Sequence, residues 1–75
     1  MSKLPPLRAK EAIKAFAKIG FIHEHTRGSH CILRRPVDKR KLVVPLHGQK
    51  TLGKGLLLSL IHDANLTKEE FGQLL

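Results

Sequence analysis

The residue types best suited to chemistry occur in one short stretch, Arg27-Gly28-Ser29-His30, which runs directly into the apolar residues Cys31-Ile32-Leu33. Glycine allows a sharp backbone turn, and the aliphatic residues after it favour a β-strand. A histidine at this junction would be held by a strand yet stay accessible, and it can take or give a proton near neutral pH. Because Arg34 and Arg35 follow closely, the stretch would attract a phosphodiester. We hypothesise that His30 is the reactive group of a small RNA-cleaving protein; the alternative is an ordinary surface histidine at the start of a strand.

Positive charge is concentrated around this stretch. The sequence has 14 Lys and Arg against 6 Asp and Glu, which gives a formal net charge of +8. Between His25 and Gly55 the only acid is Asp38, whereas the cations are Arg27, Arg34, Arg35, Lys39, Arg40, Lys41, Lys50 and Lys54. Such a patch is typical of nucleic-acid binding, although it carries no sequence specificity. The alternatives are a solvated basic surface and a basic membrane-binding helix, which is disfavoured because the cations are not confined to one amphipathic helix.

The length and the cysteine content limit the class of protein. A chain of 75 residues is expected to form a single domain, residues 1–75. Its one cysteine, Cys31, has no partner for an internal disulfide, so a reducing, cytoplasmic location is expected. No apolar run approaches the length of a transmembrane helix, and the first residues lack the apolar core of a signal peptide.

The order of local patterns predicts an α+β fold. Apolar residues at three- and four-residue steps predict a helix from about Arg8 to Gly20. Three strands are expected over 21–26, 28–35 and 41–46, followed by a helix over 55–64. A capping box of Thr67 with Glu70 predicts a short last helix that ends at residue 73 or 74. Helices on one face of a three-stranded antiparallel sheet, in the order α-β-β-β-α with a short C-terminal helix, resemble the double-stranded-RNA-binding domain.

Two predictions concern which residues share a place on the sheet. A turn over 36–40 makes the second and third strands a hairpin, in which residues whose numbers sum to about 76 or 77 face each other. This register places His47 near Ser29 and His30. Strand alternation places His23 and His25 on one face. Because no third metal ligand follows from the spacing, we interpret these two histidines as polar residues on a solvated face and predict no metal site.

A glycine- and lysine-rich loop, residues 48–55, precedes the expected second helix. Backbone N–H groups at a helix start, together with Lys50 and Lys54, would offer an anion positive charge. The loop does not match a Walker A motif, which has a different spacing.

Several short motifs, in their order and spacing, resemble the HicA-type toxins, also called the YcfA-like family. They are Gly28-Ser29-His30, Arg34 with Pro36, Val44-Pro45-Leu46-His47-Gly48, and Gly55-Leu56-Leu57-Leu58-Ser59-Leu60-Ile61. The resemblance runs from about Leu4 to Leu75. The family often has Gly-Thr-Leu where this chain has Gly55-Leu56-Leu57, and a glycine where it has Asn65.

The resemblance implies a metal-independent mRNA interferase of a toxin–antitoxin module, which inhibits translation and growth until it is neutralised. The family's catalytic histidine falls on His30, which would act as general base on the ribose 2′-hydroxyl. No cofactor is expected, and carboxylate clusters for two-metal chemistry are absent from the sequence. His47 could act as the acid or pack at the edge of the core. The residues expected to bind RNA are Arg27, Gly28, Ser29, Arg34, His47, Lys50 and Lys54.

The expected partners are mRNA and a HicB-type antitoxin that covers the catalytic face, with the toxin alone a monomer and no membrane partner. Two alternatives remain. A non-catalytic double-stranded-RNA-binding module would use the basic face and leave His30 as a contact. A DNA-binding module is disfavoured because no helix-turn-helix spacing is evident.

Overall fold

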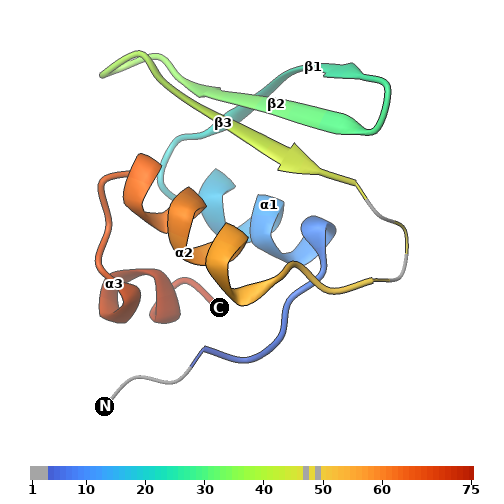
Figure 1. Ribbon diagram of the computed structural model, residues 1–75. Helices are drawn as coiled ribbons and strands as arrows, with labels where there is room; N and C mark the ends of the chain where they lie inside the picture. The colour runs from blue at the N-terminus through green and yellow to red at the C-terminus, as the bar shows by residue number, and fades with distance from the viewer. Residues whose placement is uncertain (1–3, 47, 49) are drawn as a thin grey trace.

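The computed structural model describes residues 4–46, 48 and 50–75. Its elements, in chain order, are α1 (Ala9–Ala17), β1 (Ile22–Arg27), β2 (His30–Arg35), β3 (Arg40–Pro45), α2 (Lys54–Asp63) and α3 (Lys68–Gly72). The strands form an antiparallel sheet in the order β1-β2-β3, and the helices lie below one of its faces (Figure 1). The predicted α+β fold is therefore confirmed, with strand and helix ends that differ from the prediction by one or two residues, except that α1 ends three residues earlier.

Local chemistry explains where the helices begin and end. The N–H of Arg8 donates a 2.9 Å hydrogen bond to Oε1 of Glu11 at the start of α1, and Gly20, with φ of +99°, ends the turn that follows α1. The predicted capping box of α3 is present: the N–H of Thr67 donates to Oε1 of Glu70, and the N–H of Glu70 donates to Oγ1 of Thr67. Each bond satisfies a backbone or side-chain group that the helix itself leaves unpaired.

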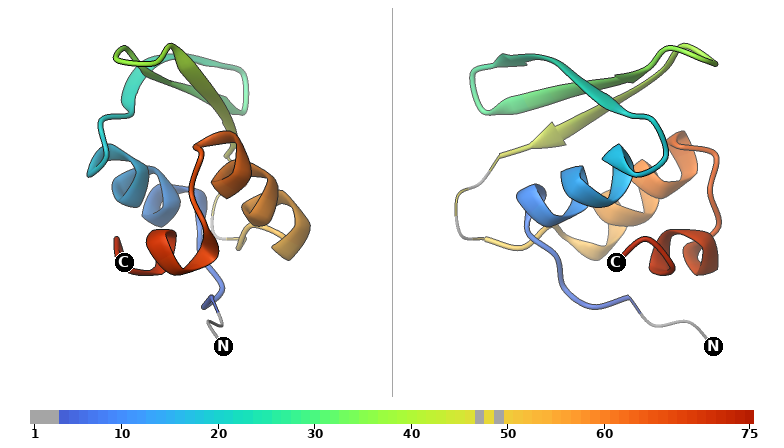
Figure 2. Two further views of the ribbon diagram at one scale, coloured as in Figure 1. Left: turned by 90° about the vertical axis from the view of Figure 1, so that its left-hand side faces the viewer. Right: turned by 180° about the vertical axis from the view of Figure 1, so that it is seen from behind.

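The core lies between the sheet and the helices. Three aromatic rings fill its centre, because the Phe16 ring of α1 lies 5.9 Å from the ring of Phe21 and 5.0 Å from that of Phe71, between ring centroids. Leu33 of β2 and Leu42 of β3 close the core from the sheet side and are almost fully buried. By contrast, all six residues of β1 are exposed, so the helices cover β2 and β3 but leave β1 at an open edge (Figure 2).

The register of the β2–β3 hairpin differs from the prediction. Arg35 pairs with Arg40, rather than with Lys41 or Leu42, and His30 pairs with Pro45. The turn closes one residue earlier than predicted because Lys39 adopts a positive φ of 59° and the N–H of Arg40 donates to Oδ1 of Asp38. His47, which the predicted register placed near Ser29 and His30, lies outside the described residues.

A β-bulge in β1 changes which face His23 occupies, and so contradicts the prediction that His23 and His25 lie on the same face. His23 pairs with Leu33, but His25 pairs with Ile32, so that Glu24 is an extra residue in the ladder. Because Ile32 and Leu33 project from opposite faces, His23 and His25 also lie on opposite faces. The prediction that the two histidines share a face is therefore wrong.

Candidate active site on the outer face of the sheet

The alternation of side chains along β2 separates a core face from an outer face. Cys31 and Leu33 belong to the buried core, and Arg35 reaches the helices, where it donates to the carbonyl oxygen of Ala64. His30 and the other alternate residues of β2 must then project from the face opposite the helices. His30 is thus held on a strand whose other face is packed into the core.

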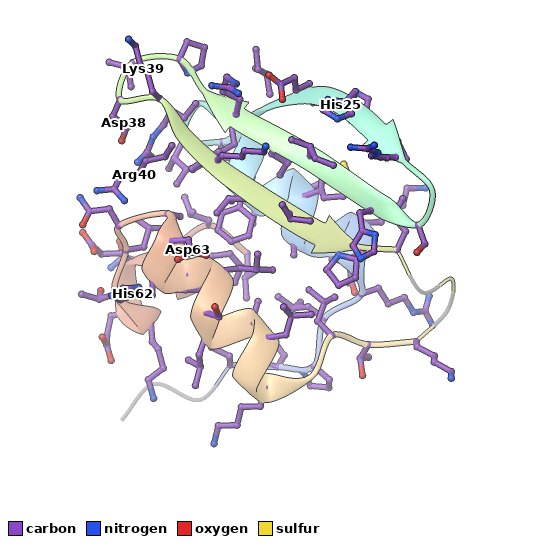
Figure 3. All side chains as sticks on the ribbon, turned by 45° about the horizontal axis from the view of Figure 1, so that its top comes forward. His25, Asp38, Lys39, Arg40, His62 and Asp63 are labelled. Atoms are coloured by element: carbon purple, nitrogen blue, oxygen red, sulfur yellow. The ribbon has the colours of Figure 1, made fainter. Side chains whose placement is uncertain are left out.

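Strand pairing arranges the outer face in three cross-strand rows. Residues paired across an antiparallel sheet lie on the same face, with Cβ atoms about 4.5–5.5 Å apart. The rows are Arg27–His30–Pro45, His25–Ile32–Val43 and Ile22–Arg34–Lys41. We call these nine residues the outer face; Figure 3 looks onto it, with His25 at the β1 edge. Cationic and imidazole side chains thus surround a small apolar centre.

The turn before His30 explains why glycine stands at position 28. Gly28 and Ser29 form a two-residue connection between β1 and β2, and Gly28 has a positive φ of 58°, whereas Ser29 does not. This pattern of φ matches the type II′ hairpin turn, which favours glycine at its first central position. A Cβ at Gly28 would meet no atom within 4 Å, so backbone conformation, rather than space, favours glycine here.

His30 is exposed, and its imidazole takes part in no hydrogen bond or ion pair with the described residues. Its cross-strand neighbours are Arg27 and Pro45. Proline offers no charge and no N–H, so Arg27 is the one charged residue in this row. An accessible imidazole directly opposite a guanidinium can take a proton from a hydroxyl group next to a phosphate that the cation holds.

Arg34, a predicted RNA-binding residue in the third row, forms an ion pair with Glu24. Nε of Arg34 donates a 2.7 Å hydrogen bond to Oε1 of Glu24, and this bond holds the pKa of the Glu24 carboxyl below its ordinary value. The other oxygen of Glu24 lies 3.5 Å from Nδ1 of His25. Arg34 is therefore present on the outer face, but its charge is partly neutralised.

The far end of the sheet holds arginines with a structural role. Arg35 pairs with Asp38 at 2.8 Å, lies over the ring of Phe21, and donates to the carbonyl oxygens of Ile19 and Ala64. Its hydrogen bonds lower the pKa of Asp38. Arg40 contacts Asp38 and donates to the carbonyl oxygen of Asp63, and Figure 3 shows these residues at the end of the sheet above α2. These two mid-chain cations tie the hairpin turn to the helix ends.

The loop before α2 lies at the same end of the molecule as the Gly28 turn (Figures 1 and 2). The N–H of Leu52 donates to the carbonyl oxygen of Leu7 at 2.6 Å, which fixes the loop beside the start of α1. Gly53 is the N-cap of α2, no side chain caps it, and the first turn of α2 contains no acid. Lys50 and Lys54 flank this uncapped start, in a different layer from His30.

The structure thus brings together only part of the predicted site. Arg27, Gly28, Ser29 and His30 form one turn at the edge of the outer face, whereas Arg34 lies two rows away and Lys50 and Lys54 lie beyond the sheet. Among residues 4–46, 48 and 50–75, no cluster of three or more His, Cys, Asp or Glu side chains could hold a metal ion.

His25 lies on the outer face beside this turn, and the sequence-based site did not include it. Regular pairing from Arg27–His30 to His25–Ile32 places it there, two residues from Arg27, and the bulge at Glu24 puts His23 on the opposite face. Strand alternation from Arg27 was therefore a signal that could have found His25. Two cavities, of about 270 and 460 Å³, flank residues 4–6 on the helical side and do not include His30. Arg27, Ser29 and His30 are all exposed, so the candidate site is accessible from solvent.

Comparison with known proteins identifies the family. No helix within the described part of the chain is long and apolar enough to cross a membrane. No curated protein matches the sequence. A family model described as "HicA toxin of bacterial toxin-antitoxin" matches residues 9–66, which include all three strands, α1 and α2. The chain therefore belongs to the HicA family of toxins, whose members are paired with an antitoxin in bacterial toxin–antitoxin modules.

Proposed function

We propose that this toxin is a metal-independent endoribonuclease that cleaves mRNA with His30 as general base, and so inhibits translation and growth. The observation that carries the proposal is the exposed His30 directly opposite Arg27 on the outer face. Membership of a toxin family supports a harmful activity, and RNA is a target that carries its own nucleophile beside each phosphate.

The reaction needs little from the protein beyond proton transfer and charge stabilisation. Neutral His30 takes the proton of a ribose 2′-hydroxyl, whose oxygen attacks the adjacent phosphorus. The bond to the 5′-oxygen breaks, and that oxygen takes up a proton. The products are a 2′,3′-cyclic phosphate and a 5′-hydroxyl end. Arg27 stabilises the charge that develops on the phosphoryl oxygens. General base catalysis of this kind contributes about 10²–10⁴-fold to the rate.

The RNA backbone is proposed to run from the Gly28 turn toward the start of α2. Arg27, Gly28 and Ser29 contact the phosphate at the cleavage site, and Lys50 and Lys54 contact neighbouring phosphates. The uncapped start of α2 supports this path, because its backbone N–H groups and the helix dipole favour an anion. Arg34 is expected to contribute less than the lysines, since Glu24 accepts its hydrogen bond.

The partner that restrains this activity is proposed to be a HicB-type antitoxin that covers the outer face around His30. The toxin alone is proposed to be monomeric and to act in the cytoplasm, where mRNA is found.

The test is induced expression of the wild-type protein and of His30→Ala, with growth and mRNA integrity as readouts. His30→Ala should abolish growth arrest and RNA cleavage, while circular dichroism and the thermal midpoint stay close to those of the wild type, because the side chain is exposed. Purified wild-type protein should cleave RNA in excess EDTA. Cleavage that persists in His30→Ala would refute the assignment of the base.

One alternative has a specific observation in its favour. The basic Gly28 turn and the uncapped start of α2 lie at one end of this molecule, and this arrangement would also suit a non-catalytic double-stranded-RNA-binding module. Tight RNA binding by the wild type without any cleavage of RNA would favour that function over the ribonuclease.

A further inference from the structure

His25 occupies the second row of the outer face, next to the row that holds His30. Arg27 pairs with His30, and His25 precedes Arg27 by two residues on β1 and pairs with Ile32. His25 and His30 are therefore diagonal neighbours on one face, a relation that places their Cα atoms about 7–8 Å apart, within reach of long or ring side chains. Both histidines border Arg27, one along the strand and one across it.

The imidazole of His25 lies beside a carboxylate and is accessible. Its Nδ1 lies 3.5 Å from Oε2 of Glu24, and about half of the side chain (51%) is exposed. Glu24 is itself fixed by the 2.7 Å hydrogen bond from Arg34. Within the described residues, no partner takes the Nε2 atom of His25. A carboxylate therefore lies beside one ring nitrogen while the other stays accessible, an arrangement that suits a proton donor or acceptor.

We propose, on the basis of the ribonuclease function proposed above, that His25 is the general acid that protonates the leaving group. His30 removes the proton of the 2′-hydroxyl, and the 2′-oxygen forms its bond to phosphorus. As the bond between phosphorus and the 5′-oxygen breaks, protonated His25 gives its proton to that oxygen. His30 ends protonated and His25 neutral, and exchange of protons with water restores both.

The position of Arg27 is consistent with His30 as the base and His25 as the acid. Because His25 and His30 both border Arg27, a phosphate held by the Arg27 guanidinium would be within reach of both rings. A productive geometry needs a hydrogen bond of about 2.6–3.2 Å from each ring to its oxygen. The other charged groups that face His25 are Glu24 on its own strand, Arg34 on β2 and Lys41 on β3. Acid and base thus come from two adjacent strands with a cation between them.

The test uses two RNA oligonucleotides with one cleavage site, mapped first with the wild-type protein. In one oligonucleotide the 5′-oxygen at that site is replaced by sulfur, which departs without protonation. His25→Ala should cleave the ordinary RNA about 10²-fold more slowly than the wild type, or worse. It should cleave the sulfur-containing RNA at a rate within a few-fold of the wild type. His30→Ala should be slow on both RNAs, because the nucleophile still needs its base.

His23→Ala is the matched control. It removes an exposed histidine two residues away that lies on the opposite face, where it shares a hydrogen bond with Thr26. This variant should cleave both RNAs at the wild-type rate. The proposal is overturned if His25→Ala cleaves ordinary RNA normally, or if it is equally slow on both RNAs. A wild-type protein that cleaves neither RNA would instead refute the ribonuclease function itself.

Discussion

Two adjacent arginines at the end of β2 show how strongly the face of a strand determines the role of a residue. Arg34 points to the outer face, where it pairs with Glu24 and is accessible. Arg35 points to the core, and only 13% of its side chain is exposed. Its guanidinium reaches backbone carbonyl oxygens near the ends of α1 and α2, where cations are favoured by the helix dipole.

We expect Arg35→Ala to lower the free energy of unfolding by about 2–3 kcal/mol, because it leaves the carbonyl oxygens of Ile19 and Ala64 without their charged donor. Arg34→Ala should cost less than about 1 kcal/mol, since exposed ion pairs contribute little. Urea unfolding followed by circular dichroism measures both values. Equal unfolding midpoints for the two variants would contradict the structural role of Arg35.

Two elements depart from regular structure: β1 contains a bulge, and α2 begins without a side-chain cap. The bulge at Glu24 interrupts an edge strand whose six residues are all exposed. Bulges at sheet edges discourage pairing with other chains, and this one also puts His23 on the opposite face from His25. The start of α2 lacks a side-chain cap, in contrast to α3, whose start is satisfied by Thr67.

Charge reversal near the start of α2 tests its proposed contact with RNA. Lys50→Glu should weaken RNA binding. The slope of log affinity against log salt concentration should become shallower by about one unit, which corresponds to the loss of one phosphate contact. Arg34→Glu should weaken binding less, because Glu24 already offsets the charge of Arg34. Affinity and salt dependence come from fluorescence anisotropy titrations at several salt concentrations.

Lys39→Glu is the control for these variants, because it makes the same change of charge in the turn between β2 and β3, at the other end of the sheet. It should leave the salt dependence close to that of the wild type. If all three variants change the affinity equally, only the net charge matters and the proposed path of the RNA is wrong.

On the scale of the whole molecule, one end of the sheet contributes to stability and the other end carries the candidate site. At one end, Arg35 and Arg40 bind the hairpin turn to the helices. At the other end lie the Gly28 turn, His30 and the loop that leads into α2 (Figure 1). Stability and the proposed chemistry are therefore separated in space, so substitutions at the candidate site are expected to change activity more than stability.

A partner that neutralises the toxin is expected to compete with RNA for the outer face. A net charge of +8 favours fast association with an acidic antitoxin, and the buried centre of the interface would set the lifetime of the complex. Titration of a HicB-type antitoxin into toxin bound to labelled RNA should release the RNA. NMR should show that the signals of the His30 imidazole shift when the antitoxin binds, because the ring becomes covered.

A ternary complex of toxin, RNA and antitoxin in which the His30 imidazole stays exposed would contradict direct competition. In that case the antitoxin would inhibit from a distance, by distorting the sheet. An acidic protein of similar size that is not an antitoxin serves as the control for charge alone, and it should not displace the RNA at equal concentration.

Local sequence determined most of the elements, because their causes act within a few residues. Thr67 and Glu70 satisfy each other across one helical turn, and Asn65, with φ of 62°, adopts the left-handed conformation expected where α2 ends. Several short motifs between Gly28 and Ile61, in their order and spacing, were also enough to suggest the HicA family, which the match over residues 9–66 confirms.

The tertiary structure decided which side chains meet, because a shift of one residue in a strand exchanges its faces. The sequence shows no pattern that marks Glu24 as the extra residue of β1, yet the bulge there separates His23 from His25. The β2–β3 register depended in the same way on the turn at Asp38 and Lys39, which put Pro45 opposite His30. Arg34 and Arg35 look equivalent in the sequence, and only packing against α1 and α2 gave Arg35 its buried partners.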